Sequence, residues 1–278
     1  MSHAPRILLA VDVGNSRVKC GLFDNSAADV TMMPRCLYMA AVAVGKRLQW
    51  DEIADRVILT GETLVPGIIA GVNPGEVRRV LESWPTDGWN RPIVVEHPAR
   101  FPLTINLPAS EKVGIDRLLN AVAANAMRPC GRAAIIVDIG TATTVDYLSP
   151  QGTFEGGAIL PGFELSARSL HQQTALLPMI EIEDLAAESI EPLGRNTPDA
   201  LKSGLLWGQL GAIKELIERI SSSVTNPQFA IQNPQFKIPL VLLTGGGSSL
   251  LKPHLPDARW EPHLALQGLA LVMPHFTS

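Results

Sequence analysis

The sequence predicts an α/β protein made of two similar halves. Short apolar runs that are typical of strands alternate along the chain with longer segments of helical periodicity. A strand–turn–strand pattern with Asp-x-Gly in its turn occurs at residues 6–24 and again at residues 134–148. Because a whole pattern of this kind is repeated, we expect the second half to copy the fold of the first. The boundary is expected near residue 112, which gives halves at residues 1–111 and 112–278.

The first half is expected to open with two strands joined by a turn. The continuous apolar run at residues 7–11 is typical of a strand buried on both faces. Residues 12–16 carry turn chemistry, and residues 17–22 then alternate with the two-residue period of a second strand. Asn73-Pro74 predicts the start of a helix that runs to Trp84, since proline is favoured at the first helical position. The other elements expected in this half are strands at residues 57–60 and 92–96.

The second half is expected to carry the longer helices. Residues 116–127 place their apolar side chains on one helical face. Thr197-Pro198-Asp199 predicts the start of another helix, with a hydroxyl at the cap, proline at the first position and an acid in the first turn. The remaining elements expected here are strands at residues 134–137, 143–148 and 239–243, a helix that ends near residue 170, a short helix after residue 247 and a terminal helix at residues 264–273.

Composition and cysteine usage narrow the class of protein. Of the 278 residues, 46% are hydrophobic and 18% are charged, which is typical of a globular chain. The formal net charge is −4, so nothing supports nucleic acid as a partner. The three cysteines, Cys20, Cys36 and Cys130, are widely spaced, which argues against a disulfide framework or a zinc site. With neither a signal peptide nor an apolar segment near the roughly 20 residues that span a bilayer, we expect a cytoplasmic protein without a membrane partner.

The repeated Asp-x-Gly turn, at residues 12–15 and 138–141, is the central feature of the sequence. Neither copy matches a P-loop or the GxGxxG of a dinucleotide-binding fold. A single such turn between strands is usually only a turn, but two copies in corresponding places favour a phosphate site. Glycine lets the backbone approach phosphate oxygens closely. The side chains expected to donate hydrogen bonds to phosphate are those of Asn15, Ser16, Thr141 and Thr143.

The two aspartates of these turns are expected to hold cations, because a carboxylate repels phosphate. Asp12 is the candidate for Mg²⁺, since Arg17 and Lys19 follow its turn and can lie near the phosphates. A third glycine-rich turn, at residues 244–247, is expected to lie against adenine or ribose, where a flat backbone surface is useful. The alternative for this third turn is a simple entry into a helix.

Gly114-Ile115-Asp116-Arg117 stands at the start of an expected helix. The helix dipole keeps a carboxylate ionised at this position. Asp116 can therefore accept the proton of a substrate hydroxyl while Arg117 binds an anionic group, or it can simply cap the helix. Phosphoryl transfer has a loose transition state, so such an acid mainly positions the nucleophile.

The order of these motifs resembles that of the type III pantothenate kinases, which belong to a superfamily with acetate kinase and actin. The resemblance extends from Ile7 to the C-terminal helix, and the combination is far more specific than any one motif. The motifs that carry it are Asp-x-Gly-Asn-Ser at 12–16, Gly-x-Asp-Arg at 114–117, Asp-x-Gly-Thr-Ala-Thr-Thr at 138–144, Gly-Gly-x-Ile-x-Pro-Gly at 156–162, Asn-Thr-Pro at 196–198 and Thr-Gly-Gly at 244–246.

The resemblance implies a duplicated actin-like ATPase fold, related to ribonuclease H, with a nucleotide cleft between its halves. It also implies the first step of coenzyme A biosynthesis, in which ATP phosphorylates pantothenate to 4′-phosphopantothenate. Mg²⁺ would accompany ATP, a monovalent cation, K⁺ or NH₄⁺, would be required, and the protein would be a homodimer.

The family's functional residues carry over to matching positions of this sequence. Asp116 would be the catalytic proton acceptor, and Asp138 would ligate the monovalent cation. ATP would be bound by Asp12, Val13, Gly14, Asn15, Ser16, Arg17, Val18, Lys19 and Thr141. Pantothenate would be bound by Gly114, Ile115, Asp116, Arg117 and Thr197. The chain departs from the family at Ile115, where Ala or Pro is common, and at residues 106–108, where many members have Tyr.

Three alternatives remain open from the sequence. The first is a kinase for another small hydroxylated metabolite, although no typical sugar-kinase signature is present. The second is a regulatory protein that kept the fold and lost turnover, against which the intact Asp12, Asp116 and Asp138 argue. The third, a chaperone ATPase, is disfavoured because no substrate-binding domain follows the ATPase-like part.

Overall fold

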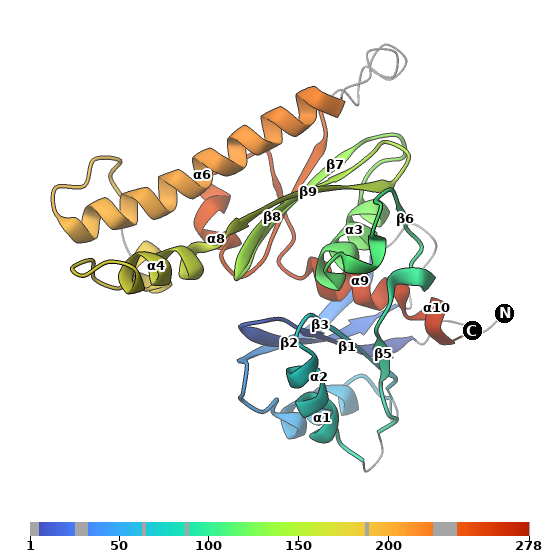
Figure 1. Cartoon of the computed structure of the whole chain (residues 1–278). Coiled ribbons are helices and arrows are strands. Elements are labelled where there is room, and N and C mark those ends of the chain that lie inside the picture. Colours follow the sequence, from blue (N-terminus) through green and yellow to red (C-terminus); the bar gives the residue numbers. More distant parts are fainter. Residues whose placement is uncertain are drawn as a thin grey trace. The chain divides into compact units, whose positions relative to one another are not determined.

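The computed structural model describes residues 6–25, 33–62, 65–86, 89–186, 189–224 and 238–277. The chain divides into two compact units, Met1–Met127 with His263–Ser278, and Arg128–Pro262 (Figure 1). Each unit is built around one mixed sheet. None of the helices in these ranges is both long enough and apolar enough to cross a membrane.

The sheet of the first unit has the strand order β3-β2-β1-β4-β5. Strand β1 lies antiparallel to β2 and parallel to β4, β2 lies antiparallel to β3, and β4 lies parallel to β5. Every residue of β1 is buried, as expected for an apolar strand in the middle of a sheet. The strands are β1 (Ile7–Val13), β2 (Arg17–Asp24), β3 (Arg35–Ala43), β4 (Gly67–Gly71) and β5 (Ile93–Val95).

Helices cover the sheet of the first unit. Residues of α1 and α2 pack with the odd-numbered residues of β1 in one hydrophobic core. Helices α3 and α9 pack on each other, and α9 also packs on β1. The helices are α1 (Trp50–Ile58), α2 (Pro74–Glu82), α3 (Ile115–Met127), α9 (Leu264–Val272) and α10 (Pro274–Thr277), with short 3₁₀ turns η1 (Pro98–Arg100) and η2 (Ser110–Lys112) and the two-residue strand β6 (Thr104–Ile105).

The strand expected at residues 57–60 is wrong, because these residues complete α1 and the turn after it. Ile53 and Val57 are both buried and lie four residues apart, which is the spacing of one helical face. Ile58 beside them is exposed. A short apolar run alone does not separate a strand from the end of an amphipathic helix.

The sheet of the second unit repeats the strand order of the first. Five of its strands lie in the order β9-β8-β7-β10-β11, which corresponds strand by strand to β3-β2-β1-β4-β5. Strand β7 is antiparallel to β8 and parallel to β10, in the same way as β1 is antiparallel to β2 and parallel to β4. The outer pairs, β8 with β9 and β10 with β11, also match. The strands are β7 (Ala134–Ile139), β8 (Ala142–Leu148), β9 (Thr153–Pro161), β10 (Leu240–Thr244) and β11 (Arg259–Trp260). This equivalence confirms the expected duplication.

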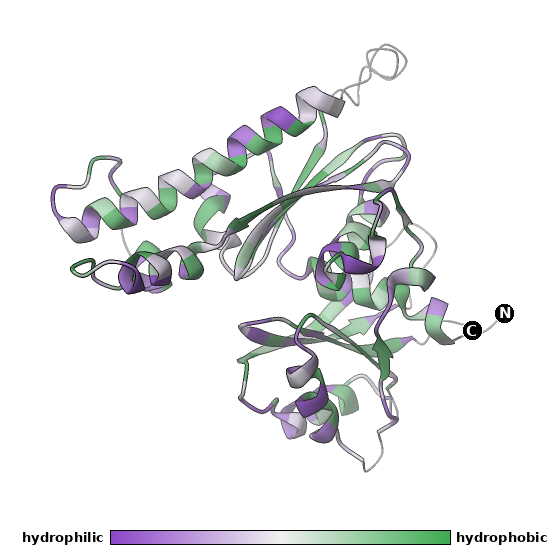
Figure 2. Ribbon diagram, viewed as in Figure 1, coloured by the Kyte–Doolittle hydropathy of each residue, from purple (hydrophilic) through white to green (hydrophobic). Residues whose placement is uncertain are grey.

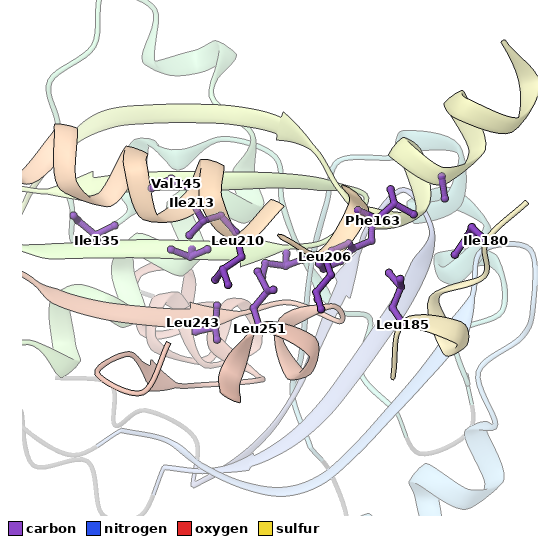
Figure 3. Close-up of a cluster of buried hydrophobic side chains, with 14 of the residues drawn as sticks. Ile135, Val145, Phe163, Ile180, Leu185, Leu206, Leu210, Ile213, Leu243 and Leu251 are labelled. Atoms are coloured by element: carbon purple, nitrogen blue, oxygen red, sulfur yellow. The ribbon is translucent and has the colours of Figure 1, made fainter. Parts of the chain in front are cut away.

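The core of the second unit lies between one face of this sheet and the long helix α6. Side chains of α6, such as Leu210 and Ile213, meet Ile135 and Val145 of the strands (Figure 3). Figure 2 shows the strands as largely hydrophobic and α6 with hydrophobic and hydrophilic residues alternating along its length. The helices are α4 (Phe163–Gln172), α5 (Ile182–Ala186), α6 (Thr197–Val224) and α8 (Ser248–Leu251), followed by the 3₁₀ turn η4 (Lys252–His254).

The compact units do not coincide with the halves expected at residues 1–111 and 112–278. Helix α3 and the C-terminal residues His263–Ser278 belong to the first unit, because α3 and α9 pack on each other and on strands of that sheet. A repeat in the sequence marks duplicated strands, whereas compact units follow the packing of the helices.

Candidate active site

The first Asp-x-Gly turn joins β1 to β2. Asp12 is the penultimate residue of β1, is only 7% exposed and lies opposite Lys19 of β2. The Gly14 amide donates a hydrogen bond to the Arg17 carbonyl at 3.0 Å, which closes the turn. The side chains of residues 15–17 are exposed at its tip. The turn therefore presents backbone groups, short polar side chains and a guanidinium to solvent.

Two of the residues expected to bind ATP have side chains that face away from solvent. Val13 and Val18 are fully buried and belong to the hydrophobic core of the first unit. Any contact that they make with phosphate has to come from their backbone groups. Lys19 is half-buried, beside Asp12 across the strand pair.

The second Asp-x-Gly turn joins β7 to β8 and is one residue shorter. The Gly140 amide donates to the Ala142 carbonyl at 3.0 Å. Asp138, again the penultimate residue of its strand, lies opposite Thr144 of β8 and Thr244 of β10. Residues opposite each other on neighbouring strands point to the same face of a sheet, so these three side chains share one face.

Thr144 and Thr143 point in opposite directions. The Thr144 hydroxyl is buried without a hydrogen-bond partner within the described part of the chain. Thr143 is fully buried, and its hydroxyl accepts a hydrogen bond of 2.7 Å from the Gln209 amide of α6. The expectation that Thr143 donates to phosphate is therefore wrong, because this side chain belongs to the core beneath the turn.

The glycine-rich turn at residues 244–247 follows β10 and comes very close to Asp138. Gly245 has a φ of +90°, and a Cβ on it would lie 2.4 Å from Asp138 Oδ1 and 2.5 Å from the Ile139 carbonyl oxygen. Only glycine fits such a position. The second unit therefore brings together Asp138 and the third turn, two features that the sequence treats as separate motifs.

Asp116 is the second residue of α3 and is half-buried. Its Oδ1 accepts a hydrogen bond of 2.8 Å from the Arg117 amide, which fixes the carboxylate at the start of the helix. A Cβ on Gly114 would lie 2.6 Å from the same Oδ1. Ile115 is buried, so it supports the helix rather than facing solvent. Asp116 therefore lies inside the first turn and not at the cap position before the helix, and its bond to the Arg117 amide holds in place a carboxylate that can accept a proton.

Thr197 is the first residue of α6 and is exposed. The cap comes one residue earlier than expected, since Asn196 Oδ1 accepts a hydrogen bond of 2.9 Å from the Asp199 amide. The expected cap at Thr197 is therefore wrong, and its hydroxyl is not required for that contact.

A cavity of about 370 Å³ lies in the first unit but contains none of the expected site residues. It opens at the start of β1, whereas Asp12 stands at the end of that strand. The residues that line it are Arg6, Ile7, Leu22, Asp24, Arg35, Leu37, Tyr38, Arg56, Leu59 and Thr60. We therefore place the candidate site at the turns and not in this cavity.

Cation ligands within the described ranges are sparse. No group of three or more His, Cys, Asp or Glu side chains there is arranged to hold a metal ion. Asp138 stands beside a threonine hydroxyl and the backbone of Gly245 instead. A cation at either aspartate therefore needs further oxygen ligands from hydroxyls, carbonyls, water or a nucleotide.

Comparison with known proteins identifies the family. A family model described as type III pantothenate kinase matches residues 8–219. A type III pantothenate kinase of Agathobacter rectalis is 30% identical over 277 residues, covering 96% of each chain. One from Legionella pneumophila (strain Corby) is 34% identical over 266 residues, covering 95% of this chain and 97% of the relative.

Among solved structures, a protein described as a Baf family transcriptional activator from Campylobacter jejuni has a similar fold. Its TM-score is 0.56 at 19% sequence identity, and the match covers 96% of this chain and 98% of that one. At this identity the likeness shows the fold alone. The family model spans all the motifs from Asp12 to Thr197, and the two relatives cover 95% or more of this chain. The chain therefore belongs to the type III pantothenate kinase family.

Proposed function

We propose that this protein is a kinase that transfers the γ-phosphoryl group of ATP to pantothenate, the first step of coenzyme A biosynthesis. The observation that carries the proposal is the match of the type III pantothenate kinase model to residues 8–219. The two Asp-x-Gly turns, in equivalent places of two equivalent sheets, are consistent with phosphate handling.

The first turn would hold the phosphates of ATP. The exposed side chains of residues 15–17 and the backbone amides of this turn are suited to donate hydrogen bonds to phosphate oxygens. Lys19 and Arg17 supply positive charge near Asp12, which would hold Mg²⁺ with the nucleotide. Mg²⁺ usually binds through one or two carboxylates and phosphate oxygens, which fits a site without an acidic cluster. Bound Mg²⁺ would neutralise charge on the transferring group.

Asp116 would accept the proton of the pantothenate hydroxyl. As that oxygen bonds to the γ-phosphorus, the bond from phosphorus to the bridging oxygen breaks and ADP leaves with the electron pair. The Asp116 carboxylate is held by the Arg117 amide, so it is oriented before substrate arrives. Arg117 and Thr197 would bind the carboxylate end of pantothenate, with Gly114 and Ile115 shaping the loop before α3.

Asp138 would hold the monovalent cation. The Thr144 hydroxyl, which is buried without a hydrogen-bond partner among the described residues, faces the same side of the sheet and would supply a second oxygen. Thr141, at the tip of this turn, would contact ATP. The bound cation would offset the negative charge of the phosphates, while the protein's part is to keep Asp138 and its neighbours in place.

A homodimer in the cytoplasm is the expected form of the protein. Large apolar side chains are exposed along β9 and α4, among them Ile159 at 62% and Leu165 at 45%. Exposed apolar surface of this kind favours association with a second copy. Pantothenate would be the small-molecule partner, with neither nucleic acid nor membrane required.

The experiment that tests the proposal is ADP release by the purified protein with ATP, Mg²⁺ and pantothenate, with K⁺ present or replaced by Na⁺. We expect turnover that depends on pantothenate and is stimulated by K⁺. Turnover only with another hydroxylated acceptor would mean that this acceptor, and not pantothenate, is the substrate. No turnover with any acceptor, together with specific binding of a macromolecule, would favour the regulatory alternative.

A further inference from the structure

A chain of hydrogen bonds connects strand β11 to the glycine-rich turn in the second unit. The indole Nε1 of Trp260 donates to Ser248 Oγ at 2.9 Å. Ser248 Oγ in turn donates to the Gly245 carbonyl oxygen at 2.6 Å. Ser248 is 1% exposed, so its hydroxyl is shielded from competing water.

The series of hydrogen bonds from Trp260 ends at Gly245, which lies in the candidate site. Its backbone is pressed against Asp138 and Ile139, so closely that neither leaves room for a Cβ on Gly245. A turn with three consecutive glycines has little conformational preference of its own. The Gly245 carbonyl accepts a hydrogen bond from the Ser248 backbone amide at 3.2 Å as well, so the shorter hydrogen bond from the hydroxyl is the side-chain contact that further restrains this peptide plane.

Trp260 is itself held on two sides. Its backbone is opposite Leu243 in the β10–β11 pair, and the Glu261 amide donates to the Leu243 carbonyl at 2.9 Å. The Lys252 ammonium lies 4.0 Å from the centre of the indole ring, within the range of a cation–π contact. The indole N–H is therefore aimed at Ser248 by contacts from both its own strand and η4.

We propose that Trp260 and Ser248 are positioning residues that hold the turn at residues 244–247 in the shape that receives the sugar or base of ATP. This inference rests on the proposed function only in requiring that ATP binds at the turn. Neither residue belongs to the motifs by which the family is recognised in this sequence. Both residues would act on the affinity for ATP through the position of the Gly245 backbone, which also borders Asp138.

The test compares ATP binding by Trp260→Phe, Ser248→Ala and the double variant, measured by calorimetry without pantothenate. Phenylalanine keeps an aromatic ring beside Lys252 but has no N–H. We expect each single variant to weaken ATP binding by about 3- to 10-fold, the effect of losing one hydrogen bond. The loss of ATP affinity in the double variant should be no larger than that in the weaker-binding single variant, because both substitutions interrupt the same series of hydrogen bonds. In steady-state assays the KM for ATP should rise while the KM for pantothenate stays unchanged.

The matched control is Trp207→Phe. It removes an indole N–H in the same unit, which donates to the Ile190 carbonyl at 3.1 Å and not to the turn, while phenylalanine keeps an aromatic ring beside His254 of η4. Equal ATP affinity in Trp260→Phe and in Trp207→Phe, or additive losses in the double variant, would overturn the inference. If wild-type protein binds ATP but does not phosphorylate pantothenate, the proposed substrate fails while this test still applies. Absence of ATP binding in the wild type would overturn both.

Discussion

The two Asp-x-Gly turns occupy the same place in sheets of the same strand order, but their neighbours differ. Asp12 of the first turn lies opposite Lys19 on the adjacent strand. Asp138 of the second turn lies opposite Thr144. The first turn also has three residues between its strands, with Arg17 at the start of the next strand, whereas the second has two. One turn therefore offers positive charge and the other neutral oxygen.

This difference teaches that the fold fixes where the two acids stand, while the adjacent strand decides what each can bind. A lysine beside a carboxylate favours phosphate nearby and leaves the acid to bind a divalent ion shared with that phosphate. A threonine hydroxyl beside a carboxylate supplies a further oxygen ligand. We therefore propose separate tasks for the two similar turns that duplication produced.

The largest expected effect comes from removing the proposed base, Asp116, while both turns stay intact. Asp116→Asn should lower kcat by at least about 100-fold, because proton acceptance by a positioned carboxylate typically contributes that much. ATP and pantothenate should still bind, since the amide can accept the same hydrogen bond from Arg117. Rates and calorimetric affinities measure this, with Glu111→Gln, an exposed acid just before α3, as the control. Near-normal kcat would exclude Asp116 from the chemistry.

The next largest effect should show whether the two turns bind different ions. Asp138→Asn should raise the K⁺ concentration needed for half-maximal activity by about tenfold or more, since a charged ligand is lost. Asp12→Asn should instead raise the Mg²⁺ requirement and leave the K⁺ response in place. Initial rates against each ion, with the other held saturating, distinguish these outcomes. If both variants shift the same ion, the turns do not have separate tasks.

A smaller effect, on stability, tests the close approach in the second turn. Gly245→Ala should destabilise the protein by about 1–3 kcal/mol, because it combines a positive φ with a clash against backbone. Gly246→Ala is the matched control, since nothing lies within 4 Å of a Cβ there and its φ is not in the left-handed region. Urea unfolding of the two variants gives the difference. Equal stability would mean that the turn relaxes freely and that Asp138 is not confined by it.

Sequence reasoning predicted the duplicated strands well because each has a clear local pattern. The buried run at residues 7–11 and its copy at residues 134–137 are apolar throughout, as central strands require. It failed at residues 57–60, where an apolar run ends an amphipathic helix. It also misjudged the border between the units, because the packing of α3 on α9 joins segments that are far apart in the sequence.

The candidate site shows the same division between local and long-range information. The motifs predicted the candidate residues of the site. They did not predict that Gly245 borders Asp138, because this contact depends on the pairing of β10 with β7. The alternation of residues in β8 could have shown that Thr143 and Thr144 face opposite sides. Trp260 and Ser248 carried no signal, because their contact joins two short elements across 12 residues.

The smallest expected effect concerns the two turns that lead into a helix, one after β4 and one after β10. These two strands occupy equivalent places in the two sheets. In the second unit that turn is held by neutral groups, Trp260 and Ser248. In the first unit that turn is capped by the neutral Asn73, whose Oδ1 accepts a hydrogen bond of 3.2 Å from the Glu76 amide, and charge instead ties α2 to the turn after β3. Glu76 of α2 is 6% exposed, accepts a hydrogen bond from the Gly45 amide at 3.2 Å and pairs with Arg79. The hydrogen bond from Arg79, followed by that from Gly45, holds the pKa of Glu76 below its ordinary value.

A carboxyl group with a lowered pKa stabilises the fold above its unfolded pKa of about 4.3, and this contribution is lost as the pH falls through the folded pKa. The melting temperature of Glu76→Gln should therefore lie below that of the wild type near neutral pH, and the difference should shrink below about pH 4. Glu82→Gln, an exposed acid at the end of the same helix, should show no such trend. A difference that stays constant from pH 7 to about pH 3 would mean that Glu76 acts through packing and that its charge does not tie α2 to the turn after β3.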